Sequence, residues 1–277
     1  MVLLEEENVS RVSSDLSEKS PKTELFNNAT LDDFPDYWKA EIEQQLGKKT
    51  VSVDELSQIR RLGLMRIEDI DFAPIKYFVS LDELVSSGST SKDFSPIGDV
   101  ATLKKLYLAK TNLSDITFLA DHKNLEKLSI GNSRVTDISV LPQLKKLKDI
   151  SLKNLEIHDY SPLRQCNKIK SLDMSGCKNF DVMTISSLKL RSLILDDIIL
   201  ENMEFLIGQS KLEELSFDMC ISKDFSVIAG LNSLTDITCP YEFFMIIKDL
   251  MDRKIRFAIK GDMTSNQYKC YEDYILK

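Results

Sequence analysis

An apolar pattern that starts at Leu103 starts again, position for position, at Leu125. Six residues of the first copy return in the second, as the pairs Leu103 and Leu125, Leu106 and Leu128, Leu108 and Ile130, Leu113 and Val135, Ile116 and Ile138, and Leu119 and Leu141. A fixed period of this length, with the spacing L-x-x-L-x-L, is the signature of a leucine-rich repeat solenoid. The sequence therefore predicts a stack of similar coils.

Each copy can form one short strand followed by a return segment. The fourth and sixth positions alternate with polar residues, so their side chains should point to one face of a strand. A second apolar cluster, at the eleventh, fourteenth and seventeenth positions, brings the chain back over the first. One copy cannot enclose this apolar stripe, whereas stacked copies pair their strands in parallel and share one core. We therefore expect an α/β leucine-rich repeat solenoid with a curved parallel β-sheet on its concave face.

Nine copies can be placed in register. They begin at Ile59, Leu81, Leu103, Leu125, Leu147, Ile169, Leu190, Leu212 and Leu234. The copies are evenly spaced except for the step from Ile169 to Leu190, which is shorter by one position. A flexible arm is predicted at 1–29, where Glu, Ser, Lys and Asn are frequent and no apolar period exists. The predicted organisation continues with a helical N-terminal cap at 30–58, the repeats at 59–239, and a C-terminal cap and tail at 240–277.

Both caps are predicted from local signals, because the end coils of a solenoid expose their core edges and need a cover. Phe34, Trp38 and Ile42 are spaced by four, and Ser52 and Glu55 have the spacing of a capping box. At the other end, residues 241–251 have a wide apolar face and residues 255–259 alternate as a strand would. Three tyrosines of the tail, at a spacing of three, suggest one helical face that packs on the cap or, alternatively, docks a partner.

One segment carries a more specific resemblance. F-P-D-Y-W-K-A-E-I-E-Q-Q-L-G-K-K-T-V-S-V-D-E-L-S-Q-I-R-R-L-G-L resembles the N-terminal cap of bacterial internalin-like leucine-rich repeat proteins. The repeats resemble the 22-residue class that those proteins share with a eukaryotic protein-phosphatase regulatory subunit, including the D-I pairs at Asp115 and Asp137. The resemblance covers roughly residues 34–240 and implies a protein that binds other proteins. Internalins are exported and often wall-anchored, whereas neither signal is found here, and the usual asparagine at the ninth position is missing.

Composition and charge exclude several classes of partner. The formal net charge of −8 over 277 residues argues against binding to nucleic acid or to an anionic membrane. No run approaches the roughly 20 apolar residues that span a bilayer. The start M-V-L-L-E-E-E-N turns acidic where a signal peptide has a basic start. We therefore expect a cytoplasmic protein, which is secreted only if the true N-terminus lies upstream.

No catalytic or metal site is predicted, and no cofactor. The chain has no P-loop, G-x-G-x-x-G, H-E-x-x-H or G-x-S-x-G motif. His122 and His158 lie at non-equivalent positions and are predicted to be solvated loop residues. Cys177 and Cys220 fall on the ninth position of a repeat, where a small buried residue is expected to bond the neighbouring coil. A metal site from these two with Cys166 is the sharper alternative, but no C-x-x-C pair exists.

The concave face remains as the candidate site. The third, fifth and seventh positions of each copy should point out of the core there, and their charges are mostly basic up to Lys153 and acidic after it. This order favours a polarised docking surface for another protein, although a solvated face with charges in chance order is the alternative. The candidate partner-binding residues are Arg61, Lys105, Tyr107, Lys127, Ser129, Asp149, Lys153, Asp173, Asp196, Glu214 and Asp218.

Three functions are compatible with this sequence. The first is a non-catalytic protein that binds another protein through its concave face. The second is a regulatory subunit of an enzyme such as a phosphatase. The third is a secreted, internalin-like surface or adhesion protein whose export signal is missing from this chain. The first requires no feature beyond the repeats themselves.

Overall fold

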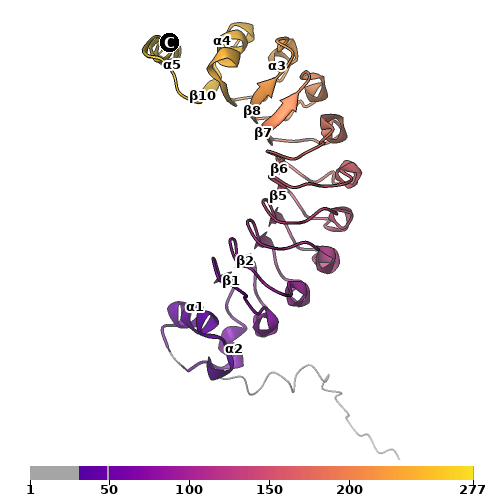
Figure 1. Cartoon of the computed structure of the whole chain (residues 1–277), viewed down its shortest axis with the longest axis vertical. Helices are drawn as coiled ribbons and strands as arrows, with labels where there is room; N and C mark the ends of the chain where they lie inside the picture. Colours follow the sequence, from indigo (N-terminus) through magenta and orange to yellow (C-terminus); the bar gives the residue numbers. More distant parts are fainter. Residues whose placement is uncertain (1–30, 49, 277) are drawn as a thin grey trace, which may run out of the picture.

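The short strands of the repeats form one continuous parallel sheet in the computed structural model, which describes residues 31–48 and 50–276. The predicted arm at 1–29 lies outside these residues. Figure 1 shows the result: the strands line the inner side of an arc, and short helices follow its outer side. The strand order is sequential from β1 to β10. The predicted α/β leucine-rich repeat solenoid with a concave parallel sheet is therefore confirmed.

The predicted register of the repeats is also the observed one. Leu62 pairs with Leu84, and the fourth positions of the later copies pair in the same way, including Leu172 with Leu193 across the predicted shorter step. The strands are β1 (Arg61–Gly63), β2 (Glu83–Val85), β3 (Lys105–Tyr107), β4 (Lys127–Ser129), β5 (Asp149–Ser151), β6 (Ser171–Asp173), β7 (Ser192–Leu200), β8 (Glu214–Cys220), β9 (Asp236–Pro240) and β10 (Arg256–Lys260).

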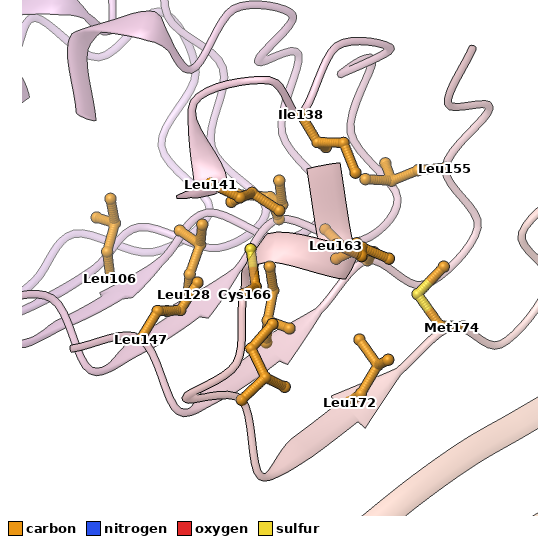
Figure 2. Close-up of a cluster of buried hydrophobic side chains, with 14 of the residues drawn as sticks. Leu106, Leu128, Ile138, Leu141, Leu147, Leu155, Leu163, Cys166, Leu172 and Met174 are labelled. Atoms are coloured by element: carbon orange, nitrogen blue, oxygen red, sulfur yellow. The ribbon is translucent and has the colours of Figure 1, made fainter. Parts of the chain in front are cut away.

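The return segments on the convex side are mostly 3-10 helices. They are η3 (Ala73–Tyr77), η4 (Ser95–Asp99), η5 (Thr117–Asp121), η6 (Leu141–Gln143), η7 (Ser161–Gln165), η8 (Val182–Ile185), η9 (Glu204–Leu206) and the short α-helix α3 (Ser226–Ala229). Apolar residues from both sides of each coil meet between strand and helix. Figure 2 shows Leu106 and Leu128 on the strand side of the core, with Ile138, Leu141 and Leu163 on its convex side. All five are buried, as expected for a core built from stacked apolar stripes.

An acidic residue at the thirteenth position begins each of several return segments. The carboxylate of Asp115 accepts a hydrogen bond from the Thr117 N–H at 2.8 Å, and that of Asp137 accepts one from the Ser139 N–H at 2.7 Å. These bonds satisfy N–H groups that have no partner within a short helix. In the seventh coil Asn202 takes the same place and accepts from the Glu204 N–H at 2.9 Å. Asp115 and Asp137 therefore act as turn residues that accept hydrogen bonds from the backbone.

Asp115→Ala should lower the free energy of unfolding by about 1 kcal/mol, because the Thr117 N–H would lose its protein acceptor. Asp115→Asn should leave it nearly unchanged, since an amide oxygen already serves this purpose at Asn202. Urea denaturation of the two variants measures the difference. Equal losses would show that the negative charge, rather than the acceptor, stabilises the turn.

The N-terminal cap contains η2 (Leu31–Asp33), α1 (Asp36–Leu46) and α2 (Val53–Leu56). Trp38 and Ile42 are fully buried, and Trp38 stacks on Phe78 with ring centroids 5.4 Å apart. The indole N–H of Trp38 donates to the Asp71 carbonyl at 2.9 Å. The Ser52 side chain and Glu55 form the predicted capping box at the start of α2. These contacts cover the apolar edge of the first coil, as the sequence predicted.

At the other end, α4 (Tyr241–Leu250) and α5 (Ser265–Leu276) flank β10. The predicted strand at 255–259 is confirmed as β10, which pairs with β9. The Tyr274 hydroxyl donates to the Ile255 carbonyl at 2.8 Å and accepts from the Ile255 N–H at 3.1 Å, and the Tyr271 hydroxyl donates to the Phe257 carbonyl. These tyrosines satisfy part of the edge of the sheet, which limits pairing with another chain.

The ninth position binds the coils together through small side chains. The Ser89 hydroxyl donates to the Leu64 carbonyl at 2.9 Å, and the Cys177 thiol donates to the Leu152 carbonyl at 3.1 Å. Both bonds reach the preceding coil, as predicted. Thr111 differs, because its hydroxyl donates to the Leu108 carbonyl within its own coil at 2.7 Å.

Candidate functional site

Every residue of the predicted site lies on the concave side of the sheet. The strand residues between them, such as Leu106, Leu128 and Ile150, are buried. Because successive side chains of a strand point to opposite faces, the residues on either side of each buried one face outward. The third and fifth positions of neighbouring strands pair directly, which places Lys105 beside Lys127 and Tyr107 beside Ser129. The sheet therefore brings the predicted residues into adjacent rows.

The first coils hold a row of paired charges. Glu83 accepts from the Arg61 Nε at 3.2 Å and from the Lys105 Nζ at 3.4 Å. Both cations are mostly exposed, so each pair contributes little to stability. Arg61 and Lys105 are nevertheless already neutralised in part, and less of their charge is available to a partner.

Tyr107 and Lys127 form the centre of the candidate site. The Lys127 Nζ lies 5.9 Å from the centroid of the Tyr107 ring, within the range of a cation–π contact. Tyr107 is partly exposed. In the described part of the chain, neither Lys127 nor Lys153 forms an ion pair with a carboxylate. This region thus offers an aromatic ring and two cations whose charges are not paired.

The acidic residues of the later coils differ in how far they are engaged. Asp173 accepts from the Ser151 hydroxyl at 2.9 Å and from the Ser175 N–H at 3.0 Å. Asp218 accepts from the Asp197 N–H at 2.9 Å. Asp149 and Glu214 have no hydrogen bond or ion pair through their carboxylates among the described residues. A shallow depression of the concave face over these coils is lined by Ser192, Ile194, Asp196, Glu214, Ser216, Asp236 and Thr238.

Strand β10 adds two cations that the predicted site did not contain. The Arg256 guanidinium contacts the Asp236 carboxylate at 2.6 Å, and the Lys260 ammonium contacts Asp196. Partial burial is the largest single effect and raises the pKa of the Asp236 carboxyl, but the hydrogen bonds from Arg256 and Thr235 and the charge of Arg256 together outweigh it and lower that pKa. The repeat positions alone predicted a uniformly acidic face over the later coils. The structure differs, because the C-terminal cap extends the sheet by one strand and adds these two cations.

Comparison with known proteins agrees with this geometry. The family described as Leucine Rich repeats (2 copies) matches residues 101–143. The solved structure of an internalin (inlF) from Listeria monocytogenes has a TM-score of 0.68 at 22% identity, over 82% of this chain and 75% of that one. This chain has the internalin type of leucine-rich repeat fold. Internalin C2 (inlC2) from the same organism gives a TM-score of 0.67 at 21% identity, over 73% of this chain and 92% of that one.

The resemblance to internalin-like proteins is thus confirmed, and at these identities it establishes the fold. The sequence matches none of the curated proteins with which it was compared. No helix in the described ranges is long and apolar enough to cross a membrane. Within the same ranges, no three His, Cys, Asp or Glu side chains are grouped so that they could hold a metal ion.

His122 is a residue whose position the sequence prediction missed. It is fully buried in this internalin-like solenoid rather than solvated, whereas His158 is exposed as predicted. His122 occupies the twentieth position of its repeat, and the residues at that position are buried in every coil from the first to the eighth: Phe78, Val100, His122, Leu144, Cys166, Leu188, Gln209 and Leu231. Aligning this column would have revealed its burial from the sequence.

The two polar members of this column differ in their partners. The Gln209 amide nitrogen donates to the Ser186 carbonyl at 3.1 Å, and its oxygen accepts from the Leu190 N–H at 3.3 Å. Neither ring nitrogen of His122 has a hydrogen-bond partner in the structure of residues 31–48 and 50–276. Burial lowers the pKa of His122 below its ordinary value of 6.5. The imidazole therefore stays neutral inside the core, at a cost in stability.

Proposed function

We propose that this chain is a non-catalytic binding protein that docks another protein along its concave face. The observation that carries the proposal is the pairing of Tyr107 with Lys127, because an aromatic ring beside unneutralised cations is typical of an interface anchor. Lys153 lies in the same face and also lacks an ion pair among the described residues. The partner should present an acidic region to these two lysines.

The later coils should meet a basic region of the same partner. Glu214 forms no hydrogen bond or ion pair through its carboxylate among the described residues, whereas Asp196 and Asp236 are already engaged by Lys260 and Arg256. Charge complementarity of this kind acts mainly on the rate and orientation of association. Its effect should weaken as salt is raised from about 0.05 to 0.5 M, since the screening length falls severalfold over that range.

A crosslinking pull-down from the native cytosol, with wild type and the Tyr107→Ala, Lys127→Glu double variant, tests this proposal. The protein that wild type captures should be lost from the variant. With that protein purified, Lys127→Glu should slow association roughly severalfold, because it reverses the charge that steers the encounter. Tyr107→Ala should raise the dissociation rate about tenfold or more, because a buried aromatic side chain is lost from the interface.

Lys145→Glu is the matched control, because Lys145 is exposed and lies outside the concave rows. It makes the same change of charge and should leave both rate constants near wild type. A partner that binds the double variant and wild type equally would place the interface elsewhere on the solenoid.

The cysteines support a reducing compartment for this function. All five are free, and Cys166, Cys177, Cys220 and Cys239 are buried. Burial raises the pKa of Cys166 to about 11 and that of Cys239 to about 12, so both remain unreactive thiols at neutral pH. Free thiols without disulfides are usual in cytosolic proteins. We propose a cytoplasmic location on this basis.

A further inference from the structure

The seventh and eighth coils depart from the regular repeat just after their strands. In the first seven coils the eighth position has a left-handed backbone, at Arg66, Gly88, Lys110, Asn132, Asn154, Gly176 and Asp197. In the eighth coil this turn is lost, and Met219 continues β8. Ile199 then pairs with Met219 and Leu200 with Cys220, after a shift in register that follows Leu195. The two strands thus run on side by side beyond the concave rows.

Three apolar side chains are exposed on this extension. Ile199 is 67% exposed, Ile221 is 68% exposed and Met219 is 39% exposed, whereas the alternating Leu200 and Cys220 are buried. The Ile221 N–H donates to the Leu200 carbonyl at 2.7 Å, which places Ile221 next to the paired Ile199 and Met219. We call these three residues the apolar strip. Adjacent exposed apolar residues of this kind mark interaction surfaces more often than single ones do.

Packing within the repeat does not explain the two isoleucines. They occupy the tenth position, which is polar in all six earlier coils, as Glu68, Thr90, Asn112, Arg134, Glu156 and Lys178. A coil of this solenoid therefore forms without an apolar residue at that position. The change to isoleucine in two consecutive coils, both largely exposed, indicates a role outside the core.

Three acidic residues, Asp197, Glu201 and Asp218, lie within two positions of the strip along the chain. Asp197 precedes Ile199 by two positions and donates its N–H to the Asp218 carboxylate at 2.9 Å, while the Glu201 carbonyl accepts from the Ser222 N–H at 3.0 Å. In the chain as described, none of these three carboxylates forms an ion pair with a basic side chain. Lys223, the nearby cation in sequence, is engaged by Glu242 at 3.4 Å and lies over the Phe243 ring.

We infer that the apolar strip docks a segment of a partner protein in which aliphatic or aromatic side chains are flanked by lysine or arginine. The apolar side chains would cover Ile199, Met219 and Ile221, and the basic ones would neutralise Asp197, Asp218 and Glu201. Burial of exposed apolar surface drives such binding, and the carboxylates orient it. This surface shares Asp218 with the proposed concave site, extends beyond the concave rows, and is a binding site additional to the concave one.

This inference can be tested by selecting peptides from an unbiased displayed library on the full chain. The affinity of the selected peptides is then measured by fluorescence anisotropy. The selected peptides should combine apolar and basic residues. Ile199→Thr with Ile221→Thr should weaken their binding about tenfold or more, because the apolar contact is lost. Asp197→Asn with Glu201→Gln should weaken it roughly threefold and reduce its salt dependence. Both variants should fold, since Thr90 occupies the tenth position and Asn132 the left-handed eighth position of other coils.

Two control variants separate this site from other surfaces. Met183→Thr removes a similarly exposed apolar side chain on the convex side and should leave binding unchanged. Tyr107→Ala should also leave it unchanged; loss of binding there would move the peptides to the concave face and overturn the inference while supporting the proposed function. The inference would be overturned if the selected peptides were acidic or if no peptide were selected. It would also be overturned if the isoleucine variant bound the peptides as tightly as wild type. A dimer of the full chain that the isoleucine variant dissociates would overturn it too, because the strip would then be covered by a second copy.

Discussion

Leu128→Ala should lower the free energy of unfolding by about 2–5 kcal/mol. Leu128 is fully buried, and its side chain belongs to a row of buried residues that runs from strand to strand, with Leu106 before it and Ile150 after it. Truncation removes buried surface and leaves a cavity that the stacked coils on both sides cannot close, because their own side chains are fixed in the same row (Figure 2). Urea denaturation followed by circular dichroism measures the loss.

Ser129→Ala is the matched control, at the next position of the same strand. Ser129 points out of the core on the concave face and is partly exposed, so its change should stay below about 0.5 kcal/mol. A large difference between two adjacent positions is expected only if the strand alternates as the register of the repeats requires. Equal losses would contradict that register.

His122→Leu should raise the free energy of unfolding by about 1–3 kcal/mol at neutral pH, because it removes two buried nitrogens that have no hydrogen-bond partner in the described structure. Leucine is the residue at the same position of other coils, at Leu144, Leu188 and Leu231, and all three are buried. The substitution therefore places a side chain already used in this column at a position of similar size. Denaturation at neutral pH measures the gain.

The wild type should also lose stability on acidification, for the same reason. Burial lowers the pKa of His122, while the carbonyl groups of Ile97, Leu119 and Val100 and the carboxylate of Asp121 oppose the shift. None of these groups is placed for a hydrogen bond to the ring. Because the unfolded chain binds a proton near pH 6.5 and the folded chain does not, stability is complete above that pH and falls as the pH drops from there toward the folded pKa.

His122→Leu should abolish this part of the pH dependence between about pH 7 and pH 5, above the range in which most carboxylates titrate. His158→Gln is the control, because His158 is exposed and its replacement leaves the buried imidazole in place. It should retain the acid-induced loss. If His122→Leu and wild type lost stability in parallel over this range, another group would be responsible.

Most of the repeat architecture could be read from the chain before the structure. The apolar period set the register of β1–β9, including the shortened step before Leu190. The alternation within each strand identified Lys105, Tyr107 and Lys127 as outward-facing, because side chains on a strand alternate strictly between its two faces. A short-range period suffices for these features, since each coil contacts only its neighbours.

The burial of His122 was within reach of the sequence but was not recognised. Its column also contains Phe78, Val100 and Leu144, whose apolar character would have predicted a buried position. Its place just ahead of a repeat's first leucine, considered alone, predicts a loop residue. The column is decisive here because equivalent positions of a solenoid share one environment, whatever residue they carry.

The charges of the concave face and the apolar strip were decided by tertiary structure. Arg256 and Lys260 reach Asp236 and Asp196 only because β10 joins the sheet, through a cap that breaks the period and pairs with β9 at a shorter offset than the repeats use. Met219 pairs with Ile199 only because the eighth coil loses its left-handed turn. The sequence by itself determined which segments repeat, because a period identifies the residues that share an environment. Where the period ends, packing between unlike segments sets the register, and no local pattern encodes that outcome.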